Sequence, residues 1–135
     1  MKGIISLLIV MLFSVSNAYS DTLSFSKNLL AGKTFYIQED TGYETVAKYY
    51  LDNNKLKLFY VIFYKGQLEE TDKLDATINS RGRIAYTVFN IPTELELTEV
   101  GTKEYVVNEY HSKVHKNTLV LQFEKPDNFA RIKKQ

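Results

Sequence analysis

The sequence predicts an all-β fold, an eight-stranded antiparallel up-and-down barrel. Short runs rich in Tyr, Phe, Val, Ile and Thr recur about every ten residues, each bounded by Gly, Asn, Asp or Lys. The links between the runs are short, whereas parallel strands need crossover connections of a dozen or more residues. A flat meander would expose two unpaired edges, and closure into a barrel removes both.

The first eighteen residues have the composition of a secretory signal peptide. Lys2 precedes an apolar stretch from Ile4 to Phe13, and Ser16-Asn17-Ala18 fits a small-x-small cleavage site. The apolar stretch is shorter than the roughly 20 residues that cross a bilayer, so a retained membrane anchor is the less favoured alternative. We expect an exported protein, periplasmic or secreted, and the cysteine-free composition rich in Lys, Asn, Ile and Tyr is typical of a bacterial one.

After this segment the chain divides into a lead-in and one domain. Residues 19–30 are a Ser- and Thr-rich lead-in whose order the sequence leaves open, and residues 31–135 have the length of a single barrel domain. A short helix is possible at either terminus, near Ser26 to Leu30 and from Asp127 to Lys133.

Eight runs are expected to be strands, joined by turns suited to left-handed backbone conformations. The runs are Lys33 to Gln38, Glu44 to Leu51, Lys55 to Tyr64, Lys73 to Asn79, Arg83 to Asn90, Glu94 to Glu99, Lys103 to Tyr110 and Asn117 to Glu124. The turns are Asp40-Thr41-Gly42, Asp52-Asn53-Asn54, Lys65-Gly66, Asn79 through Gly82 and Val100-Gly101.

Several runs alternate apolar and polar residues, as strands with one wet face do. Leu119, Leu121 and Phe123, for example, share one face of their run. Residues 55–64 are instead apolar on both faces. Cover by the lead-in or the tail would explain this pattern, and so would a contact with a second copy of the chain.

Charge and cysteine content exclude several classes of partner. The chain has 17 Lys and Arg, of which only Lys2 lies in residues 1–18, so the rest of the chain has as many basic residues as its 16 Asp and Glu. A neutral chain with interspersed signs lacks the basic field that captures nucleic acid or anionic membranes. The absence of cysteine removes disulfides and any lipid-attachment site.

The tyrosines are the most conspicuous candidates for ligand contact, with ten in the chain. A ring with a polar tip suits a ligand cup, although aromatic residues also fill the cores of β proteins. The inward-facing aromatics of the expected strands are the predicted ligand-binding residues: Phe35, Tyr49, Tyr60, Tyr86 and Tyr105.

No catalytic or metal site is predicted, and no cofactor. His111 and His115 lie four apart in an expected loop without the glutamate and helix that a zinc protease motif needs. The acidic clusters Glu39-Asp40 and Glu69-Glu70 with Asp72 fit solvated hairpin ends. They would be catalytic only if they converged in one cleft.

The segment Leu30-Ala31-Gly32-Lys33-Thr34-Phe35-Tyr36, at the start of the meander, resembles the opening strand of the lipocalin and calycin group. Lys103-Glu104-Tyr105 and Arg131 resemble later features of that group, whereas its typical tryptophan is missing. The resemblance implies an open-ended cup that binds a small apolar molecule, with no catalytic residues.

The sequence therefore predicts an exported, non-catalytic β-barrel that binds a small, largely apolar molecule. The alternative is a periplasmic protein-interaction module, an inhibitor or accessory subunit, whose surface is the doubly apolar run of residues 55–64.

Overall fold

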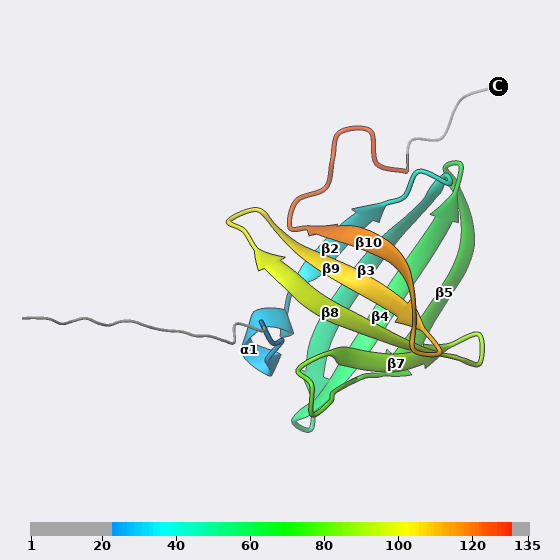
Figure 1. The fold of residues 1–135 in the computed structure, drawn as a ribbon. Coiled ribbons are helices and arrows are strands. Elements are labelled where there is room, and N and C mark those ends of the chain that lie inside the picture. Colours follow the sequence, from blue (N-terminus) through cyan, green and yellow to red (C-terminus); the bar gives the residue numbers. More distant parts are fainter. Residues whose placement is uncertain (1–22, 131–135) are drawn as a thin grey trace, which may run out of the picture.

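The computed structural model describes residues 23–130, so the expected signal peptide and the last five residues lie outside the described part. Within residues 23–130 the chain forms one short helix and nine strands (Figure 1). They are α1 (Lys27–Leu30), β2 (Thr34–Gln38), β3 (Tyr43–Asp52), β4 (Lys55–Tyr64), β5 (Gln67–Asp75), β6 (Thr77–Ile78), β7 (Ile84–Val88), β8 (Ile91–Val100), β9 (Glu104–His111) and β10 (Val114–Gln122). The prediction of an all-β protein is confirmed.

All nine strands belong to one antiparallel sheet with the order β5-β4-β3-β2-β10-β9-β8-β7-β6. Strands that follow each other in the sequence pair with each other, except that β5 does not pair with β6. The first strand, β2, also pairs with the last strand, β10. The sheet curls until its two halves face each other (Figure 1). It does not close, because β5 and β6 are its two edges.

The prediction of a closed, eight-stranded barrel is therefore wrong in both strand number and closure. β5 and β7 approach within 8 Å between Cα atoms without forming a ladder in the described sheet. Glu70 and Asp72 of β5 stand opposite Ile62 and Tyr60 of β4, so they share the inner face with these residues. Charged residues that point inward from an edge strand discourage further pairing.

The ninth strand arises where one expected run divides. The run from Lys73 to Asn79 contributes to both β5 and β6, which Ala76 separates. β5 begins earlier, at Gln67, because residues 67–75 pair with β4 along most of their length. Pairing with the apolar strand β4 thus holds an acidic stretch in a strand conformation, although its composition alone favours a turn.

Tight turns join the strands, and two of them were missed. Asn53-Asn54 and Lys65-Gly66 have positive φ at both residues, as expected for two-residue hairpins. Phe89-Asn90 and Ser112-Lys113 have the same geometry. The expected loop around His111 and His115 is therefore a hairpin, with one histidine in β9 and the other in β10.

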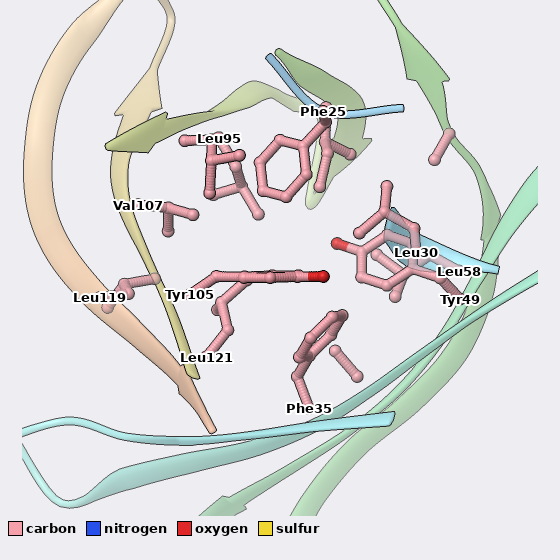
Figure 2. Close-up of a cluster of buried hydrophobic side chains, with 14 of the residues drawn as sticks. Phe25, Leu30, Phe35, Tyr49, Leu58, Leu95, Tyr105, Val107, Leu119 and Leu121 are labelled. Carbon is pink, nitrogen blue, oxygen red and sulfur yellow. The ribbon is translucent and has the colours of Figure 1, made fainter. Parts of the chain in front are cut away.

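One end of the curled sheet is filled by the lead-in. Phe25 and Leu30 are 3% and 0% exposed, and the Phe25 ring packs edge-on against Tyr105 at 6.1 Å between centroids (Figure 2). The Phe25 amide donates a hydrogen bond of 2.8 Å to the Gly82 carbonyl. α1 confirms the expected N-terminal helix and, with Phe25, closes this end of the interior.

The tail covers part of the outer face of β4. Phe129 packs edge-on against Tyr36 and Phe63, with ring centroids 5.4 and 6.3 Å apart. Phe59 and Val61, on the same face, stay half-buried. The residues from Pro126 to Ala130 form turns rather than the expected helix, whose remainder lies outside the described residues. No helix between residues 23 and 130 has the length and apolar character needed to span a membrane.

Candidate ligand-binding cavity

The interior is packed at the α1 end and hollow toward the other end. A cavity of about 210 Å³ lies between the inner faces of the two halves of the sheet. Ala47 helps to create this space, since it stands between Phe35 and Tyr60 in neighbouring strands and has the smallest side chain of the three. Most of the wall is apolar and includes Phe35, Ile37, Ala47, Leu58, Leu95, Leu119 and Leu121.

Four of the five predicted ligand-binding residues line this cavity. Phe35, Tyr49, Tyr60 and Tyr86 come from β2, β3, β4 and β7, so both halves of the sheet contribute. Tyr105 does not line it. The Tyr105 hydroxyl donates a hydrogen bond of 3.1 Å to the Leu29 carbonyl, which places this ring in the filled end.

The hydroxyl of Tyr49 is buried without a hydrogen-bond partner among residues 23–130. The side chain is 2% exposed and reaches toward the middle of the interior from the wall opposite Tyr105 (Figure 2). Burial raises the pKa of Tyr49, so the hydroxyl is neutral at physiological pH. An unsatisfied buried hydroxyl costs about 1–3 kcal/mol, which a bound polar group could recover.

The other two cavity tyrosines have acidic neighbours. Burial, then Tyr49, Glu109 and Tyr60, raise the pKa of Tyr86 well above its usual range. Burial and then the charges of Glu70 and Asp72 also raise the pKa of Tyr60, which hydrogen-bonds Glu70. Carboxylates therefore lie near Tyr60 on the β5 side of the cavity and near Tyr86 on the β9 side.

Three titratable side chains stand at the mouth of the cavity, away from α1. They are Glu39, in the turn after β2, and Glu109 and His111, at the end of β9. His111 Nε2 lies 3.2 Å from a carboxylate oxygen of Glu109, and the amide of Asn117 donates to the other oxygen at 3.0 Å. Burial and then the charge of Glu109 raise the pKa of Glu39, and His111 opposes this shift.

The sequence interpretation placed Glu39 in a solvated turn and His111 in a loop, and it did not single out Glu109. Alternation along β9 could have identified the last two, because Glu109 and His111 share a face with Tyr105 and Val107. His115 does not line the cavity, and its ring packs beside Tyr110 at 5.5 Å. No cluster of three or more potential metal-binding side chains occurs in the part of the chain that the structure describes.

The other acidic residues do not join this group. Asp40 is exposed, and the acidic residues from Glu69 to Asp72 lie along β5 and do not line the cavity. The two clusters therefore do not meet in one cleft, which was the condition set for a carboxylate-based reaction.

Exposed apolar residues also border the mouth. Phe89 is 63% exposed and Ile91 38% exposed, and both line the cavity. Phe89 has φ of 52°, a left-handed conformation that bulky side chains rarely adopt. The two-residue hairpin requires this conformation, so it is the exposed ring beside the apolar opening that makes Phe89 a candidate ligand contact.

Comparison of the chain with family models, with curated proteins and with solved structures finds no match. The functional argument therefore depends on the geometry of the cavity. An apolar space closed at one end, with polar groups at its mouth, has the form of a small-molecule site.

Proposed function

We propose that this protein is an exported, non-catalytic binder of a small, largely apolar molecule, which it holds in the cavity. The observation that carries the proposal is the partly open cavity of about 210 Å³ between the inner faces of the two halves of the sheet. Protein cores are close-packed, with few voids larger than a water molecule. The cavity is therefore far larger than the gaps that ordinary core packing leaves, and it has room for a small molecule.

The volume limits the size of that occupant. An apolar cavity of about 150 Å³ accommodates benzene. By the same scale, 210 Å³ holds roughly eight non-hydrogen atoms, and the open mouth leaves room for one or two more. The proposed ligand is therefore a molecule with one ring or a short branched chain, and long acyl chains are too large for the space as it stands.

The resemblance to the lipocalin and calycin group supports this proposal, because it implies an open-ended cup for an apolar guest. The segment from Leu30 to Tyr36 that carries the resemblance lies where α1 joins β2, at the filled end of the interior. The open edge between β5 and β6 is a departure from a closed cup.

The alternative proposal, a protein partner that binds residues 55–64, has less support. Phe129 from the tail already covers Phe63 at one end of the outer face. Phe59 and Val61 are half-buried rather than exposed. The tail therefore already occupies part of this face, and its most exposed apolar residue is Leu68 of β5, opposite Phe63.

A titration with indole, a neutral ring of suitable size, followed by amide chemical shifts tests the proposal. We expect the largest changes at Thr45, Ala47, Ile62 and Val88, whose side chains line the cavity. Residues of the outer face such as Val61 and Thr87 are the internal reference. The proposal fails if no amide shifts at millimolar indole, or if the shifts gather on the outer face of β4.

Native mass spectrometry of the protein purified from its own host is a second, independent test. A retained small molecule supports the cavity as the site of function. A stable protein complex without a small molecule supports the partner alternative instead.

A further inference from the structure

We infer that the natural occupant is a small amine with a ring-sized apolar body, held with its ammonium group between Glu39 and Glu109 and with a polar group directed toward the Tyr49 hydroxyl. This inference rests on the proposed function and specifies the chemistry of the ligand.

The charges that line the cavity are the first observation. Glu39, Glu109 and His111 are its only charged or chargeable acidic and basic side chains, and no lysine or arginine of the described residues lines it. The chain as a whole carries nearly equal numbers of acids and bases. The negative charge at the mouth is therefore a local property of the cavity and not a consequence of composition.

The two carboxylates differ in how they are satisfied. Glu109 is held by His111 at 3.2 Å and by Asn117 at 3.0 Å. The carboxylate of Glu39 is half-buried and has no hydrogen bond or ion pair with the other residues of the described chain. Burial and then the neighbouring Glu109 raise the pKa of Glu39, and His111 only partly offsets this, so the charged form of Glu39 is less favourable here than in water.

An ammonium group on the ligand would supply the missing hydrogen-bond donor and a positive charge to the Glu39 carboxylate. It donates up to three hydrogen bonds, and charge-assisted bonds to carboxylates are roughly twice as strong as neutral ones. A ligand carboxylate would instead meet two like charges. Tyr86 also lines the cavity, and aromatic rings are favourable neighbours for a cation.

The unpartnered hydroxyl of Tyr49 is the second, independent observation. Tyr49 is 2% exposed, lines the cavity and lies on β3 four residues farther from the mouth than Thr45. Most buried hydroxyls have a hydrogen-bond partner, either in the protein or in ordered water, and a ligand group can take the place of that water. A ligand whose ammonium group is at the mouth would present its opposite end to this hydroxyl.

Isothermal titration calorimetry with four small molecules of similar shape tests the inference. The set is 2-phenylethylamine, the neutral 2-phenylethanol, the anionic phenylacetate and tyramine, which adds a phenolic hydroxyl to the first. We expect 2-phenylethylamine to bind about tenfold more tightly than 2-phenylethanol, and phenylacetate to bind most weakly. We expect tyramine to bind several-fold more tightly than 2-phenylethylamine, because its hydroxyl can pair with Tyr49.

Three variants assign the effects to residues. Glu39→Gln keeps the shape of the side chain and should weaken 2-phenylethylamine about tenfold while it leaves 2-phenylethanol unchanged. Glu124→Gln removes an exposed carboxylate that does not line the cavity and should change neither affinity. Tyr49→Phe should remove the advantage of tyramine and leave 2-phenylethylamine as it was. Circular dichroism melts check that each variant is folded.

The possible failures are distinguishable. Equal binding of 2-phenylethylamine and 2-phenylethanol overturns the amine inference and leaves the proposed function standing. Equal binding of tyramine and 2-phenylethylamine overturns the part that concerns Tyr49. If none of the four molecules binds and indole does not bind either, the proposed function itself is wrong.

Discussion

The substitution Ala47→Leu should fill part of the cavity and abolish ligand binding while it changes the free energy of unfolding little. Ala47 is 6% exposed, lines the cavity and stands between Phe35 and Tyr60 on the inner face. Leucine at this position adds three carbon groups, each about the size of a water molecule, or about 30 Å³. They would occupy about 90 Å³ and leave about 120 Å³, less than the ~150 Å³ that accommodates benzene.

The free energy of unfolding should change little in the same variant. Burying three carbon groups stabilises the protein by about 2 kcal/mol, at about 0.8 kcal/mol for each. Imperfect fit in a preformed space costs about 1–3 kcal/mol. These terms nearly cancel, so we expect Ala47→Leu to fall within about 1 kcal/mol of the parent.

Calorimetric titration with indole or 2-phenylethylamine measures the loss of binding, and urea denaturation measures stability. Ala85→Leu is the matched control, because Ala85 is half-buried on the opposite face of β7 and does not line the cavity. A folded Ala47→Leu variant with the affinity of the parent refutes the cavity as the binding site. A loss of more than about 3 kcal/mol refutes the argument that the space beside Ala47 is empty.

Three further changes test other parts of the structure. Phe25→Ala should lower the free energy of unfolding by about 3–5 kcal/mol in urea denaturation, because its ring is 3% exposed and packs on Tyr105; a loss below about 1 kcal/mol would show that the lead-in is not part of the core. Phe89→Asn should raise stability by about 1 kcal/mol and weaken indole binding, because asparagine tolerates the positive φ but removes an apolar wall; lower stability would contradict the inferred strain. The raised pKa of Glu39 means that the folded chain holds this proton more firmly than the unfolded chain, so the contribution of Glu39 to the stability of the protein without ligand falls as pH rises through this pKa. Glu39→Gln should therefore melt at a higher temperature than the parent at neutral pH and at the same temperature near about pH 3, and an advantage that persists at low pH would contradict the electrostatic explanation.

Local sequence signals were sufficient for most strands and turns. The run from residue 55 to residue 64 has the bounds of β4, and Asn53-Asn54 and Lys65-Gly66 adopt the positive φ values that their composition favours. Phe89-Asn90 and Ser112-Lys113 have the same geometry with no glycine and at most one asparagine, so the turn signal was weaker there. The strand expected from the sequence began later than β5 does, because the acidic residues at the start of β5 have low strand propensity. Pairing with β4 overcomes this low propensity.

The cavity could be predicted only in part. Alternation within single strands was enough to place Phe35, Tyr49, Tyr60 and Tyr86 on the inner face. It could not tell Tyr105 from the other four, because only the lead-in decides which end of the interior is filled. Nor could it bring together Glu39 and Glu109, which are distant in the sequence and meet across the β2 and β9 ends of the curled sheet.

The sequence by itself determined the class of fold, the antiparallel order of neighbouring strands and the apolar side of several strands. These properties depend on residues one or two positions apart and on the conformations of individual turns. Only the tertiary structure decided that the sheet stays open beside β5, that Phe25 and α1 fill one end, and that a space remains around Ala47. The physical reason is that closure and hollowness depend on how side chains from distant strands divide one shared volume, and no single strand contains that information.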